Sequence, residues 1–229
     1  MVELVEKANE YEFKLTLAFT PQWGKFIASD SARLDLARQW RTQGHEIGFQ
    51  HHPVTHIDWD GYSNESDVVN YPLYLGPVND GFSYVNALAS PDNVISSTIG
   101  GLPGDFPSHM TSPTLVYGEG NADNSYPQLG SVRSLKPIYS RPIIRDIERD
   151  LLQLTTRGFT TGMDISLEEA LPVLQEQYRT MADDEVFGIV WHEFDYFLEK
   201  DTYLQWFDFI KKNGSSVKTM KEISLEYLQ

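Results

Sequence analysis

The chain has 229 residues, with 18 Lys plus Arg against 33 Asp plus Glu, so its formal net charge is −15. Such a charge argues against a nucleic acid or an anionic membrane as partner, because both bind basic surfaces. The absence of cysteine excludes disulfides, thiolate zinc fingers and a catalytic Cys. No apolar run reaches the roughly 18 residues of a membrane span, so we expect no membrane insertion.

The first fifth of the chain alternates between helix and strand patterns. The predicted elements are a helix at 2–11, a strand at 15–20, a helix from Asp30 or Ser31 to Gly44, and a strand at 45–50. This order is typical of parallel βα units. We therefore predict an α/β fold with a mostly parallel sheet, open or closed, in which a helix unusually comes first.

The middle of the chain is dominated by turn residues, with nine glycines and seven prolines between residues 60 and 130. The regular elements predicted there are a helix at 82–89 and strands at 94–99 and 114–117. A run of this kind indicates ligand-facing loops, and an inserted β-rich unit is the alternative. We treat residues 60–135 as a loop-rich insertion within a single domain covering 1–229.

Regular patterns return after residue 135. The predicted elements are helices at 142–154, 166–181 and 201–214, strands at 186–191 and 217–220, and a terminal helix. Ser166 and Glu169 form a capping box for the second of these helices, and Pro172 should kink it.

Basic residues are missing from residues 42–132, which also hold five of the six histidines. The same stretch carries ten acids: Glu46, Asp58, Asp60, Glu65, Asp67, Asp80, Asp92, Asp105, Glu119 and Asp123. A surface of this composition attracts cations and repels anionic ligands. The plainer interpretation is a solvated acidic surface that contains no lysine.

The strongest local signal is a group of four histidines within residues 45–56, three of which follow the strand predicted at 45–50. His52 and His56 are four residues apart, and Pro53 can begin a helical turn that would place both rings on one face. Such a pair can bind one cation. The pair would also lie beyond the carboxyl end of a strand, where α/β folds bind their ligands.

A second signal follows the strand predicted at 186–191. There, His192 precedes Glu193 and Asp195, either of which could fix the tautomer of its ring. A lone histidine at such a place is usually a hydrogen-bonded core group. Together with the first cluster, His192 becomes a candidate acid or base facing the same site.

These residues resemble a known family. Gly44-His45-Glu46-Ile47-Gly48 followed by His52 and His56 is similar to the second motif of the polysaccharide deacetylases, carbohydrate esterase family four, whose domain is called the NodB-homology fold. Ile189-Val190-Trp191-His192 looks like the strand and histidine of that family's last motif. The lead-in to Gly44 and the closing segment are similar too, so the resemblance spans most of the chain.

The resemblance implies a distorted (β/α) barrel with mostly parallel strands and a divalent metal, most often zinc. It implies that His52 and His56 are metal ligands and that His192 protonates the leaving amine. It also implies an N-acetylated glycan as substrate, with the metal polarising the acetyl carbonyl and activating water. Trp59 is the aromatic residue we expect to stack on a sugar ring.

The sequence departs from the family pattern at several points. Two extra residues precede the histidine pair, which makes His51 a rival ligand. The family's first motif, an Asp-Asp pair that ends its first strand and supplies the base and third ligand, should precede Val2 but is absent there; Asp58 and Asp60 are possible substitutes. The Arg-Pro motif matches only Arg141-Pro142, which is predicted to begin a helix.

The leading hypothesis is a metal-dependent hydrolase that removes N-acetyl groups from an amino-sugar polysaccharide or oligosaccharide. The alternative is a catalytically inactive deacetylase-like domain that binds glycans or acts as a scaffold. An unrelated α/β hydrolase is less favoured, because no Gly-x-Ser-x-Gly elbow is present. The sequence leaves the oligomeric state and the localisation open; a cell-envelope or secreted role would require an upstream signal.

Overall fold

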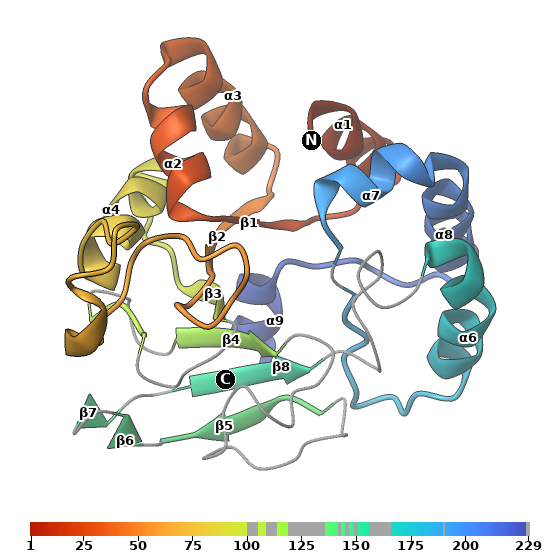
Figure 1. Cartoon of the computed structure of the whole chain (residues 1–229). Coiled ribbons are helices and arrows are strands. Elements are labelled where there is room, and N and C mark those ends of the chain that lie inside the picture. Colours follow the sequence, from red (N-terminus) through yellow and green to blue (C-terminus); the bar gives the residue numbers. More distant parts are fainter. Residues whose placement is uncertain are drawn as a thin grey trace.

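The computed structural model describes residues 1–99, 105–108, 114–118, 136–141, 143–144, 147–148, 151–155, 166–189 and 191–227. This part of the chain has a mixed α/β architecture, in which helices surround a central sheet (Figure 1). The helices are α1 (Val2–Glu10), α2 (Pro21–Ala28), α3 (Ser31–Thr42), α4 (Val78–Ala89), α6 (Leu167–Arg179), α7 (Glu193–Leu198), α8 (Lys200–Lys212) and α9 (Met220–Tyr227), with a 3₁₀ turn η1 at Ser66–Val68. None of the helices in these ranges is long and apolar enough to cross a bilayer.

The central sheet has six strands in the order β1-β2-β3-β4-β8-β5. They are β1 (Thr16–Phe19), β2 (Glu46–His51), β3 (Ser96–Ile99), β4 (Thr114–Gly118), β8 (Leu151–Thr155) and β5 (Ile138–Ser140). The pairs from β1 to β8 are all parallel, and β5 runs antiparallel to β8. The predicted mostly parallel sheet is thus confirmed. Within the described residues its edges, β1 and β5, do not pair, so the sheet is open and a closed barrel is not seen.

Two main clusters of buried side chains hold the helices in place. The first joins β1 and β2 to α2, α3 and α4, with Phe49 and Phe82 in edge-to-face contact at 5.3 Å. The second joins α1, α6, α7 and α8, with Tyr196 and Tyr203 among its fully buried members. Helix α1 contributes Val5 to the first cluster and Leu4 to the second, and therefore links the two sides.

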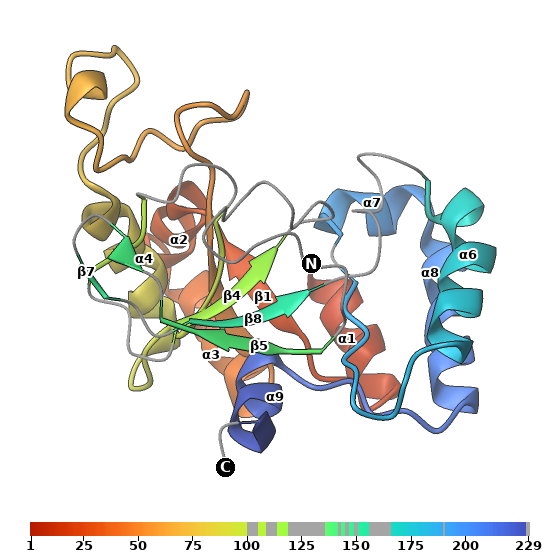
Figure 2. The same ribbon diagram turned by 90° about the horizontal axis from the view of Figure 1, so that it is seen from below.

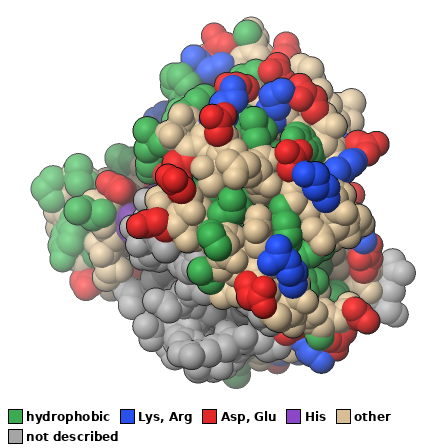
Figure 3. Space-filling view, turned by 90° about the vertical axis from the view of Figure 1, so that its right-hand side faces the viewer, with side chains coloured by type: hydrophobic (Ala, Val, Ile, Leu, Met, Phe, Trp, Pro, Cys, Tyr) green, Lys and Arg blue, Asp and Glu red, His purple; other side chains and the backbone are tan. Residues whose placement is uncertain are grey.

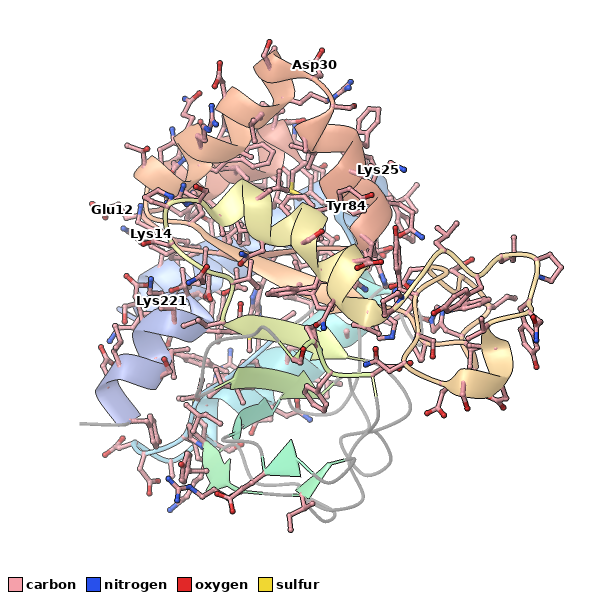
Figure 4. All side chains as sticks on the ribbon, turned by 90° about the vertical axis from the view of Figure 1, so that its left-hand side faces the viewer. Glu12, Lys14, Lys25, Asp30, Tyr84 and Lys221 are labelled. Carbon is pink, nitrogen blue, oxygen red and sulfur yellow. The ribbon has the colours of Figure 1, made fainter. Side chains whose placement is uncertain are left out.

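Helices α2 and α4 approach each other closely at Gly24. A Cβ added there would lie 2.9 Å from the Val85 backbone nitrogen and 3.0 Å from the Tyr84 carbonyl carbon. One residue further on, the Lys25 ammonium lies 5.5 Å from the centre of the Tyr84 ring. Figure 4 shows these two side chains beside α2 and α4. The missing side chain of Gly24 lets this helix pair form beside β2.

The predicted helices at 2–11 and 82–89 are confirmed. Ser166 caps α6 as predicted, because its Oγ accepts from the Glu169 backbone N–H at 3.2 Å, but the Glu169 carboxylate accepts from the Ser166 hydroxyl and not from the backbone N–H that a capping box requires. Gly44 ends α3 with a positive φ of 94°, as expected of a C-terminal glycine. Pro172 lies inside α6.

The predicted helix at 142–154 is wrong. The chain forms the short antiparallel pair β6 (Ile143–Ile144) and β7 (Ile147–Glu148) and then β8. Leu152 and Leu154 are buried while β8 pairs with both β4 and β5. Burial at alternate positions is the strand period, and pairing with distant strands overrides local helical spacing.

The segments flanking the last helices also differ from expectation. Residues 186–191 contain single bridge positions at Gly188 and Trp191 instead of a described strand, and residues 217–220 lead directly into α9. Helices α2 and α7 were not predicted. Pro21 begins α2 immediately after β1, a position where proline is well tolerated.

Candidate functional site

Strand β2 carries the histidine cluster to the carboxyl end of the sheet. It pairs in parallel with β1 and β3, and Ile47, Phe49 and His51 are buried along it. Because alternate residues of a strand share one face, His51 follows Ile47 and Phe49 toward the core. The His51 ring stacks on Phe49 with centroids 6.2 Å apart. Backbone geometry thus turns His51 inward and leaves His52 on the opposite side.

His51 lies between two buried carboxylates. Its Nδ1 is 2.8 Å from Asp60 Oδ2 and its Nε2 is 3.3 Å from Asp105 Oδ2, and all three side chains are at most 1% exposed. Burial alone lowers the pKa of His51, but hydrogen bonds and charges from Asp105 and Asp60 outweigh it and raise the pKa to about 9. Both ring nitrogens therefore donate, and His51 is an imidazolium at neutral pH.

The two carboxylates also bind the loop that follows β2. Asp60 accepts from the backbone N–H groups of His52 at 3.0 Å and Tyr62 at 3.1 Å. Asp105 accepts from the Asn64 backbone N–H at 2.8 Å and from the Ser63 hydroxyl. Each carboxylate is thus held by several donors, which is the arrangement that makes buried charge tolerable. The Asp60–His51–Asp105 network ties residues 52–64 and 105–108 to the end of β2.

His52 and His56 come together as predicted, with ring centroids 4.2 Å apart and planes inclined by 23°. His52 Nδ1 donates to the Asp58 carbonyl at 3.1 Å, and its Nε2 accepts from the Gln50 amide at 2.9 Å. His56 Nδ1 instead accepts from the Asp58 backbone N–H at 3.0 Å. The neutral His56 ring therefore carries its proton on Nε2.

These hydrogen bonds decide how well each histidine suits a metal. His52 has the tautomer usual for a ligand, since Nδ1–H is fixed by a carbonyl, but the Nε2 lone pair accepts from the Gln50 amide, which a metal must displace. His56 must release Asp58 N–H before it can bind beside His52, and His51 has no lone pair to offer while both carboxylates hold it. Over the described ranges, no group of three or more His, Asp or Glu side chains has metal-binding geometry.

His192 lies at the N-cap of α7 and contacts neither His52 nor His56 through any hydrogen bond or ring contact seen between described residues. Its backbone N–H donates to Asp195 Oδ2 at 3.1 Å, while its Nδ1 lies 3.6 Å from that oxygen and has no hydrogen-bond partner in the described part of the chain. Burial raises the pKa of the Asp195 carboxyl. Asp195 thus holds the His192 backbone, whereas the sequence predicted that Asp195 or Glu193 would fix the tautomer of the ring; Glu193 begins α7.

The remaining candidates are scattered around the loop. The Asp58 side chain is exposed, and its backbone carbonyl and N–H bind the rings of His52 and His56. Asp60, the other possible substitute ligand, forms an ion pair with His51. Trp59 is half-buried: its Nε1 donates to the Tyr62 carbonyl and its ring meets Tyr71 edge-on at 6.3 Å.

Two further candidates come from residues after position 100: His109, a possible loop ligand or simply an exposed residue, and the Arg141-Pro142 pair. His109 and Pro142 lie outside the described residues, and Arg141 is exposed beside Tyr139. Sequence reasoning missed the role of Asp105, which is separated from His51 by more than fifty positions. The sequence signal for Asp105 was weak: it is an acid a few residues after the strand predicted at 94–99.

Strand β1 is the neighbour of β2 at the edge of the sheet. It pairs with β2 in register and is followed by Thr20 and Pro21, so no carboxylate follows it directly. The acid pair that the resemblance implies is expected before Val2 and not at this strand. Gln22 of α2 donates a hydrogen bond from its side-chain amide to the Asp60 carbonyl at 2.5 Å.

Comparison with known proteins gives no match to a family model, a curated protein or a solved structure.

Proposed function

We propose that the chain is a metal-dependent hydrolase that removes N-acetyl groups from an amino-sugar polysaccharide or oligosaccharide, in the manner of the polysaccharide deacetylases. One observation carries the proposal: the rings of His52 and His56 lie 4.2 Å apart just after the carboxyl end of β2. Parallel α/β sheets bind their ligands at this end. The Lys-free and Arg-free composition of residues 42–132 also favours a cation and a neutral glycan.

In this proposal His52 and His56 would hold the metal once the Gln50 amide and the Asp58 N–H, which bind their rings in this structure, are displaced. A bound zinc ion supplies Lewis-acid polarisation of the acetyl carbonyl and activates water. His192 would donate a proton to the leaving amine. The Asp195 carboxylate lies 3.6 Å from its Nδ1. The Asp60–His51–Asp105 network keeps the backbone of His52 in place.

A second function is favoured by the surroundings of the histidine pair. In the described ranges no third His, Asp or Glu side chain forms a metal-binding group with His52 and His56, whereas the deacetylase chemistry uses acids as base and ligand. The second candidate is therefore a deacetylase-like domain that binds an N-acetylated glycan without hydrolysing it. Both candidates use the same surface and differ only in catalysis.

Acetate release from N-acetylglucosamine oligomers, measured on zinc-supplemented protein, separates the two. The hydrolase predicts steady acetate release, its loss in His52→Ala, and a decrease of about 10²–10⁴-fold in His192→Ala. The exposed Gln39→Ala change on α3 is the control and should leave the rate unchanged. Glycan binding by calorimetry without acetate release would support the second candidate, and neither binding nor release would contradict both.

A further inference from the structure

The loop after β2 exposes an unusual set of apolar side chains. We call the segment that carries them the apolar loop. Its exposed apolar side chains are Ile57, Val69, Tyr71, Leu73 and Leu75. Ile57 is 95% exposed and Leu73 is 67% exposed. The loop projects away from the body of the molecule in Figure 2, and Figure 3 shows the projection covered largely by hydrophobic side chains. Apolar surface gathered in this way usually marks a binding site.

The apolar loop is held firmly in this exposed conformation. The Leu75 N–H donates to the Gly61 carbonyl at 2.7 Å, and the Ser63 N–H donates to the Gly76 carbonyl at 3.1 Å. Gly61 has a φ of +84°, and an added Cβ would lie 2.7 Å from the Leu73 carbonyl oxygen. The base of the loop is fixed by the Asp60–His51–Asp105 network. Because the loop is already ordered, a partner does not have to restrict it on binding.

The size and shape of the apolar loop do not suit a protein partner. A stable protein interface uses about 20–30 residues from each side, whereas the apolar loop offers five large apolar side chains on a projection. Four of them are aliphatic, and aliphatic side chains match acyl chains better than they match sugar rings. A projecting aliphatic group with an aromatic residue beside it is typical of contact with the interface of a lipid bilayer.

The charges around the apolar loop select the kind of lipid. Asp58 and Asp67 are exposed on the same loop, and residues 42–132 contain no Lys or Arg. Anionic headgroups would be repelled by these acids and by the net charge of −15. A choline headgroup presents a quaternary ammonium, which acids attract and which the half-exposed Tyr71 ring can bind through its face.

We propose that the apolar loop docks this protein on the surface of a bilayer rich in zwitterionic phosphatidylcholine-type lipids. Ile57, Leu73 and Leu75 enter the interface, while Asp58 and Asp67 face the choline groups. The docking that we propose is peripheral; none of the helices in the described ranges is long and apolar enough to cross a bilayer. The proposal is independent of the proposed hydrolase, because it uses neither His52 nor His56.

Flotation with phosphatidylcholine vesicles tests the proposal on the full chain. The wild type should float with the vesicles, and Ile57→Ser/Leu73→Ser should lower the partition coefficient by about a hundredfold, since each of the two buried aliphatic groups contributes about tenfold. Both positions are exposed, and circular dichroism checks that the fold is unchanged. The matched control is Leu198→Ser on α7, which removes a side chain that is 77% exposed elsewhere and should bind as the wild type does.

Lipid composition and self-association provide the remaining outcomes. Replacing a third of the phosphatidylcholine by phosphatidylserine should weaken flotation. Equal flotation of wild type and Ile57→Ser/Leu73→Ser, stronger binding to phosphatidylserine vesicles, or no flotation at all would each overturn the proposal. A dimer in sedimentation velocity that Ile57→Ser/Leu73→Ser dissociates would instead assign the apolar loop to a second copy of the chain, and would overturn it too.

Discussion

At the scale of single residues, His51 and its neighbour His52 have different roles, because successive side chains of β2 point to opposite faces of the sheet. The alternation of β2 turns His51 into the core, where Asp60 and Asp105 hold both its nitrogens. His52 faces the other way, with a ring arranged like that of a metal ligand. We infer that His51 is a structural cation, and that its role is to hold the loop on which His52 and His56 lie.

Replacing His51 by leucine should therefore be strongly destabilising. The change leaves two carboxylates buried without their cation, and breaking a buried ion pair in this way costs about 3–5 kcal/mol. Urea unfolding measures the loss. Adding Asp105→Asn to His51→Leu removes one of the two buried, unpaired negative charges and should recover part of the stability. A loss below about 1 kcal/mol in His51→Leu would contradict the structural role.

The raised pKa of His51 also predicts an alkaline dependence of stability. Its pKa is about 9 in the folded protein and about 6.5 in an unfolded chain. The folded state thus binds the proton more tightly, so the contribution is complete below pH 6.5 and is lost as the pH rises through 9. The shift corresponds to about 3 kcal/mol.

Urea unfolding of wild type and His51→Leu at intervals between pH 6 and pH 9.5 checks this dependence. The difference in unfolding free energy between the two proteins should shrink toward alkaline pH, because the wild type loses what the variant already lacks. Parallel pH profiles would show that His51 does not titrate as described. The comparison cancels other groups that titrate in both proteins.

At the scale of elements, local pattern was enough for most helices but not for the strands after residue 135. Ile143, Ile147 and Leu151 satisfy a helical spacing, yet the chain forms β6, β7 and β8 there. Their strand state depends on β4 and β5, which no local window contains. The candidate site shows the same division: the spacing of His52 and His56 is local, whereas the position of Asp105 beside His51 is set by the tertiary fold.

The contact between α2 and α4 gives a prediction at this scale. Gly24→Ala should destabilise the protein by about 1–3 kcal/mol through overpacking, although alanine favours an isolated helix by about 1 kcal/mol. The reason is that the new Cβ meets the backbone of Val85 and Tyr84, which cannot move independently of α4. Thermal unfolding measures the effect, and Gln39→Ala, a change of an exposed side chain on α3, is the control. A Gly24→Ala variant as stable as the wild type would mean that the two helices can separate without cost.

At the scale of the whole molecule, the sequence predicted the class of fold and the end of the sheet where the histidines lie. The parallel pairing of β1, β2 and β3 follows from the alternation of helices and strands, since α2 and α3 separate the first two strands and α4 the next two. A barrel was expected from the resemblance to the polysaccharide deacetylases, whereas the described strands form an open sheet. Closure depends on pairing between the two ends of the chain, which local spacing does not specify.

Calorimetric titration with zinc chloride tests the central claim, that the end of β2 is a metal site, most directly. The account predicts one ion bound per chain in the wild type, no measurable binding in His52→Ala/His56→Ala, and wild-type binding in the control Gln39→Ala. The histidine pair is partly exposed, so its removal should leave the fold intact. Zinc affinity that is equal in wild type and His52→Ala/His56→Ala, or absent from both, would contradict the account.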